Sequence, residues 1–164
     1  MRDESALARH FLAALAYRFH KAVAGAPERF AILDAGHGIR APLAIVHHIN
    51  GVLGYGREVL RTGRVDYRHH HPRLDWPGEV EQVHATLADI DGLLSQGRGG
   101  DSERIRRLLQ GPLSDAMAHV GQLAMLRRMA GSPIPGENFY LAAIHPGRVS
   151  EEQPDPVSPD DNES

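Results

Sequence analysis

Apolar residues recur at helical spacing in four long stretches of this 164-residue chain. In the first stretch, residues 4–23, an apolar residue returns at every fourth position, at Leu7, Phe11, Leu15 and Phe19. Gly25 and Pro27 then end the pattern. The second stretch, residues 42–61, has a proline in its first turn, and its apolar face comprises Ala41, Ile45, Val52 and Val59. This spacing predicts amphipathic helices that each bury one face.

Two later stretches, residues 77–95 and 113–130, have the same character. A shorter amphipathic segment, residues 103–110, precedes the last stretch and follows residues that can cap a helix. Helices of about 30 Å are typical of an antiparallel bundle, although two long loops indicate that not every connection is a simple hairpin. We therefore predict an all-α fold, a four-helix bundle over residues 1–149 with a short extra helix before the last core helix.

The composition supports helices and excludes several kinds of site. Aromatic residues make up only 5% of the chain, which disfavours a β-sandwich or barrel. The chain has no cysteine, so disulfides, Fe–S clusters and thiolate catalysis are excluded. Six of the 21 acidic residues lie after residue 149, in a proline-rich end without Lys or Arg. We expect residues 150–164 to form a disordered acidic tail.

The charge and hydropathy patterns also bear on partners. Without its acidic end the chain is close to neutral, which argues against nucleic acid as a partner, DNA included. No apolar run reaches the ~20 residues that span a bilayer, and the opening MRDESALARH does not have the pattern of a signal peptide. We expect a cytoplasmic protein with no membrane partner.

The candidate chemistry lies among the 11 histidines. His48 lies on the apolar face of the second helix, with His47 at the rim, and His119 lies on the apolar stripe of the last helix, one turn after Asp115. Two inward imidazoles and a carboxylate suit a divalent metal ion between facing helices. The alternative is a buried His119–Asp115 hydrogen bond, with His48 satisfied separately. The run 69–71, three histidines, is more typical of a solvated loop, because three consecutive loop residues cannot all face one ion.

Two segments resemble the DinB-like superfamily of metal-binding four-helix bundles. His48-Ile49-Asn50-Gly51-Val52 resembles a motif in the second helix of that family, and His119-Val120-Gly121-Gln122 resembles part of the motif in its last core helix. The family has a further histidine where this chain has Asp115. The resemblance therefore implies metal ligands His48, Asp115 and His119, with Gln122 supporting a ligand or contacting substrate. Zinc, nickel, iron and manganese all suit this ligand set.

The same resemblance implies a metal-dependent enzyme that forms a homodimer. Its reaction is a thiol-dependent transfer or isomerisation, or a hydrolysis, in which the metal activates a thiol or water. A low-molecular-weight thiol has to be a cosubstrate, because the chain has no cysteine. The alternative hypothesis is a non-catalytic helical bundle, a stress-associated binding or dimerisation module without metal, and the aspartate at a ligand position favours it.

Overall fold

The computed structural model describes residues 2–65 and 71–156. Its elements are α1 (Arg2–Val23), η1 (Phe30–Ile32), α2 (Pro42–Thr62), α3 (Trp76–Ser95), α4 (Ser102–Leu108), η2 (Leu109–Leu113) and α5 (Ser114–Met129). This part of the chain contains helices and no strand, which confirms the all-α prediction. The four long helices begin and end within two residues of their predicted bounds.

Local sequence signals account for these bounds. α2 begins at Pro42, whose fixed φ suits a first helical turn, and it ends where Gly63 takes the left-handed conformation at φ 73°. α3 begins after Asp75, whose carboxylate accepts a hydrogen bond from the backbone N–H of Gly78 at 3.0 Å. Asp101 caps α4 in the same way. Each cap satisfies an N–H group that has no partner within its helix.

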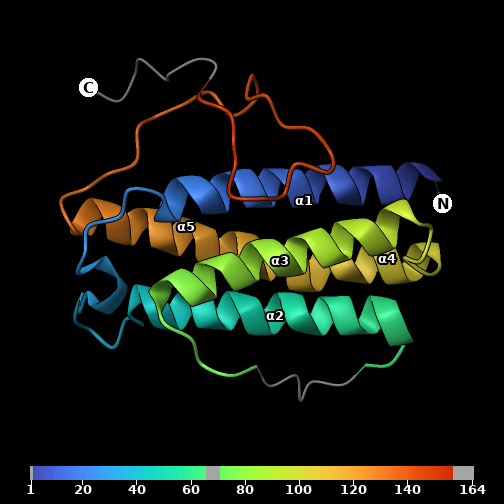
Figure 1. Cartoon of the computed structure of the whole chain (residues 1–164), viewed down its shortest axis with the longest axis horizontal. Helices are drawn as coiled ribbons and strands as arrows, with labels where there is room; N and C mark the ends of the chain where they lie inside the picture. The colour runs from blue at the N-terminus through green and yellow to red at the C-terminus, as the bar shows by residue number, and fades with distance from the viewer. Residues whose placement is uncertain (1, 66–70, 157–164) are drawn as a thin grey trace.

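The helices pack side by side in the order α1, α3, α2, α5 around a common core, as Figure 1 shows. Cross-helix contacts give their directions. His47 and Arg57 of α2 pair with residues 79 and 89 of α3, so these two helices run parallel. By contrast, α1 is antiparallel to α3. Arg9, early in α1, pairs with Asp91 late in α3, whereas Phe19, late in α1, packs on His84 earlier in α3. The bundle is therefore not antiparallel throughout, and the long connections predicted from the sequence make this topology possible.

The core is built almost entirely from aliphatic side chains. The buried face of α1 comprises Ala8, Leu12, Leu15, Ala16 and Phe19, and that of α2 comprises Ile45, Val46, Ile49, Leu53 and Leu60. The prediction for Leu7 was wrong, because its side chain is 67% exposed. Its neighbour Ala8 takes the inward position, whereas Leu15 and Phe19 of the predicted stripe are buried as expected, so the deviation is confined to the start of α1.

The last core helix is longer than α5 alone. α4 continues through η2, a single π-helical turn that contains Pro112, directly into α5. Proline has no backbone N–H and cannot continue α-helical hydrogen bonding, so it accounts for the extra residue in this turn. The predicted short helix and last core helix therefore form one continuous helical element in Figure 1.

The segment that follows α5 returns to the bundle and lies along α1 (Figure 1). Phe139 packs edge-on against Tyr17 with ring centroids 6.3 Å apart. Val149 is buried, and its carbonyl accepts a hydrogen bond from Nδ1 of the buried His84 at 2.8 Å. Residues 151–156 carry exposed or half-exposed side chains, and the rest of the predicted tail, 157–164, lies outside the described residues.

Across residues 2–65 and 71–156, every helix is too short or too polar to cross a lipid bilayer.

Candidate metal centre

A groove runs between α2 and the helical element formed by α4, η2 and α5, with a cavity volume of about 1400 Å³. We refer to it as the α2–α5 groove. Its polar lining includes His47, His48, His71 and Asp115, which can ligate a metal. Two acidic residues, Asp101 and Glu103, and two basic residues, Arg104 and Arg107, line it further along.

The groove has this shape because α2 and η2 approach each other closely at one point. A Cβ atom on Gly56 would lie 3.0 Å from Cδ1 of Leu108 and 3.0 Å from Cβ of Pro112. Glycine therefore permits the π turn to pack directly on the α2 backbone. Gly51 lies more than one turn earlier, and a Cβ atom there would meet no other element of the described chain within 4 Å, so the groove is open at this point.

The first candidate cluster comprises His48 of α2 and two residues of α5, Asp115 and His119. One nitrogen or oxygen from each residue lies within 4.8 Å of the other two. Nε2 of His48 lies 3.6 Å from Oδ2 of Asp115, and Nε2 of His119 lies 3.5 Å from Oδ1 of the same carboxylate. A tetrahedral ion with bonds of about 2.1 Å sets its ligand atoms about 3.4 Å apart. These separations therefore suit a shared ion better than a hydrogen bond.

The surroundings of the two imidazoles bear on metal binding. Nδ1 of His119 donates a hydrogen bond to Oε1 of Gln122 at 2.9 Å, which leaves Nε2, the nitrogen that faces Asp115, as its ligand atom. Burial lowers the pKa of His48 below its ordinary value of 6.5, and the neighbouring His119 and Arg40 lower it further, while Asp115 opposes them. His48 is therefore neutral near pH 7, as a ligand must be.

The side chains of this cluster differ in exposure. His119 is only 13% exposed, whereas His48 is 40% and Asp115 49% exposed. The interior position predicted for His48 was therefore wrong. Ile49 faces the centre of the core instead, and His48 lies at the edge of the buried face, where it lines the groove. His47, predicted at the rim, is the less exposed of the two at 26%.

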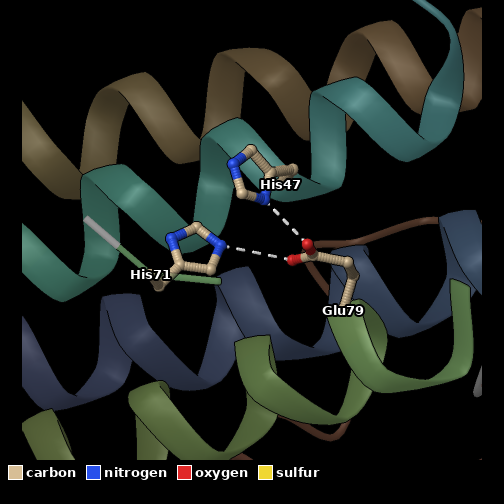
Figure 2. Close-up of side chains that lie close together, drawn as sticks. All are labelled: His47, His71 and Glu79. Atoms are coloured by element: carbon tan, nitrogen blue, oxygen red, sulfur yellow. Dashed lines mark hydrogen bonds and ion pairs between the residues drawn. The ribbon is translucent and has the colours of Figure 1, made fainter. Parts of the chain in front are cut away.

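The second candidate cluster lies where α2 meets the start of α3 and comprises His47, His71 and Glu79 (Figure 2). These residues could hold a metal ion, since one ligand atom of each lies within 4.8 Å of the others. Nδ1 of His47 donates a hydrogen bond to Oε1 of Glu79 at 2.7 Å, and Nε2 of His71 lies 3.4 Å from Oε2. The two imidazole rings also stack on each other, with centroids 4.2 Å apart.

Glu79 is fully buried at the start of α3. Burial alone would raise the pKa of its carboxyl group. The backbone N–H of Leu74 and the side chains of His47, Asn50 and His71 outweigh that effect, however, and hold the pKa below its ordinary value of 4.5. Asn50 is itself buried, and its Nδ2 donates to Oε2 of Glu79 at 2.6 Å. A charged carboxylate thus lies inside the protein beside two histidines.

The sequence did not lead us to this second cluster. We expected a solvated loop around His71, but its side chain is 14% exposed and contacts Glu79; residues 69 and 70 of the same run lie outside the described residues. One signal was present, because Glu79 falls one turn before the buried Val83 and so occupies a core position of α3. An acidic residue in an apolar stripe requires a partner inside the protein.

No protein-family model, curated protein or solved structure matches this chain. The DinB-like resemblance therefore remains a prediction from two motifs, and the side-chain geometry is the evidence for the site.

Proposed function

We propose that this protein is a metal-dependent enzyme that binds a divalent ion through His48, Asp115 and His119. The observation that supports this most directly is the spacing of the three side chains. Oδ2 of Asp115 lies 3.6 Å from Nε2 of His48, and Oδ1 of Asp115 lies 3.5 Å from Nε2 of His119. Two helices that are distant in sequence supply these groups.

The surroundings favour a reactive site over a structural one. Three protein ligands leave coordination positions for water or substrate. Both His48 and Asp115 line the α2–α5 groove and are partly exposed, so a small molecule can reach the ligand atoms. A bound divalent ion supplies a Lewis acid that activates water or a thiol at neutral pH.

The chain's own residues have separate tasks in this proposal. Gln122 holds the proton of His119 on Nδ1, which keeps Nε2 available. Asp115 provides negative charge that offsets the charge of the ion. Arg104, further along the groove, suits an anionic part of a substrate, whereas Arg107 is already paired with Glu103 at 2.9 Å.

The reaction class rests on the resemblance to DinB-like proteins. It is a transfer or isomerisation that uses a low-molecular-weight thiol, or a hydrolysis that uses water. The thiol has to come from outside the chain, which contains no cysteine. Two imidazoles and one carboxylate accept zinc, nickel, iron or manganese.

The test is a measurement of metal content. Untagged protein is stripped with a chelator, loaded with Zn²⁺, dialysed and assayed by elemental analysis. We expect His48→Ala and His119→Ala each to lose one equivalent of zinc relative to the wild type. The exposed His10→Ala should lose none and serves as the control. Unchanged zinc content in both ligand variants would contradict the proposal.

A further inference from the structure

The charge of Glu79 is unusually placed. Its side chain is 0% exposed, and in the part of the chain that the structure describes its ion-pair partners are the imidazoles of His47 and His71. A buried carboxylate requires a compensating positive charge or several hydrogen bonds. A divalent ion bound beside the carboxylate is one such positive charge.

The carboxylate is held in place by groups other than the histidines. The backbone N–H of Leu74 donates to Oε1 at 3.0 Å, and Nδ2 of Asn50 donates to Oε2 at 2.6 Å. Asn50 also donates to the backbone carbonyl of Glu79 at 2.9 Å, which fixes the orientation of its amide. Hydrogen bonds of this kind orient carboxylates that ligate metals.

The two histidines approach the carboxylate from the side that the hydrogen bonds of Leu74 and Asn50 leave open. In Figure 2, one ring nitrogen of His47 points toward one oxygen of Glu79, and one ring nitrogen of His71 points toward the other oxygen. The two nitrogens therefore converge on one carboxylate from the same region. His47 and His71 also line the groove, which gives an ion access from solvent.

We propose that His47, His71 and Glu79 form a second binding site for a divalent transition-metal ion, separate from the cluster of His48, Asp115 and His119. Two imidazoles and one carboxylate are the same donor set as in the first cluster and suit zinc, iron, nickel or cobalt. The ion takes the position between the imidazole nitrogens and the carboxylate, and it neutralises the buried charge of Glu79.

Binding at this site has a chemical requirement. Nδ1 of His47 donates to Glu79 and so carries a proton. An imidazole that ligates through Nδ1 must carry its remaining proton on Nε2. Loading the site through Nδ1 therefore requires the Nδ1 proton to leave to solvent and the bound imidazole to carry its proton on Nε2. Nitrogen NMR of the imidazole detects this change directly.

The two sites share the groove because α2 supplies consecutive histidines to them. His47 faces α3, and His48 faces α5. The second site also joins the connection before α3 to the bundle through His71, so we expect an ion there to stabilise this connection. This inference does not depend on the proposed function, since each site has its own ligands.

The experiment is the zinc stoichiometry of untagged, chelator-treated protein, with His71→Ala as the main variant. His71 lies outside the helices, so its truncation leaves the core intact. We expect two zinc ions in the wild type and in His10→Ala, one in His71→Ala, one in His119→Ala, and none in the double variant. Glu79→Gln should also bind one zinc ion. In nitrogen NMR, zinc should shift the His47 proton to Nε2 in the wild type but not in His71→Ala.

The outcomes separate the two proposals. A single ion that survives His71→Ala and is lost in His119→Ala would overturn the second site and leave the proposed function intact. A single ion that survives His119→Ala and is lost in His71→Ala would support the second site and overturn the proposed function. No bound zinc in the wild type would overturn both.

Discussion

The stability of the protein should depend strongly on the buried carboxylate of Glu79, and Glu79→Gln removes its charge with little change in shape. The carboxylate accepts three short hydrogen bonds, from His47 at 2.7 Å, Asn50 at 2.6 Å and Leu74 at 3.0 Å. The amide has only one oxygen. If that oxygen keeps the bonds from His47 and Leu74, its new NH₂ group faces the NH₂ group of Asn50, and one of them has to turn.

The size of the effect follows from these contacts. A hydrogen bond to a charged group stabilises by about 1.5–3 kcal/mol and a neutral one by about 1 kcal/mol. Weakening two bonds and losing a third costs about 2.5–7 kcal/mol by that measure, and the variant recovers part of this because it no longer buries a charge. We expect a net loss of about 2 kcal/mol, or roughly 4–8 °C in Tm.

The assay is urea denaturation followed by helical circular dichroism at pH 7, with chelator present so that metal does not contribute. Glu81→Gln, two residues later on the exposed face of α3, is the matched control and should change little. A Glu79→Gln variant within about 0.5 kcal/mol of the wild type would refute the reasoning, since the carboxylate would then contribute no more than a surface group.

The same variant tests how the stability of the protein depends on pH. The pKa of Glu79 is below 4.5 in the folded protein, so the unfolded chain takes up this proton first as the pH falls. The stabilisation is complete above pH 4.5 and declines as the pH falls from there through the lowered pKa. The difference in unfolding free energy between wild type and Glu79→Gln should therefore narrow at pH 3.5 compared with pH 6, and a constant difference would contradict the assignment.

Three further variants test other parts of the structure. Gly51→Ala should stabilise the protein by about 0.5–1 kcal/mol. Gly56→Ala should destabilise it, because its methyl group has no room beside η2. Equal effects of the two variants in urea denaturation would contradict the close packing of η2 on α2. Gln122→Ala should weaken zinc binding about 10-fold through His119, measured by competition with a chromogenic chelator, and unchanged affinity would remove Gln122 from the site. Burial lowers the pKa of His84, although its bond to a backbone carbonyl opposes this, so stability should fall below pH 6.5 as the unfolded chain takes up the proton. His84→Asn should lessen this fall, and an identical pH profile would show that His84 does not titrate as described.

Much of the helical structure could be predicted because its signals are local. Pro42 and Gly63 lie at the two ends of α2, and Asp75 caps α3, so backbone chemistry marks these bounds in the sequence itself. The rotation of a helix about its axis is less well determined. Leu7 and His48 were both placed on buried faces by spacing, and both lie at or beyond the edge, because contacts with two neighbouring helices decide which positions are buried.

The two clusters show a similar contrast. Asp115 and His119 are one turn apart on a single helix, so their proximity follows from helical geometry, and His48 was added by its position on a facing helix. The cluster at Glu79 depends on the parallel packing of α2 and α3 and on the path of the chain that brings His71 back to α2. Neither feature has a local signal, because both depend on contacts between residues far apart in sequence.

The proposed function requires His48, Asp115 and His119 to hold one ion together. Anomalous scattering at the zinc absorption edge, from crystals of zinc-loaded untagged protein, measures this. We expect a strong peak within bonding distance of both Nε2 atoms and of the Asp115 carboxylate. Zinc-loaded crystals that show no peak between these three side chains would contradict it.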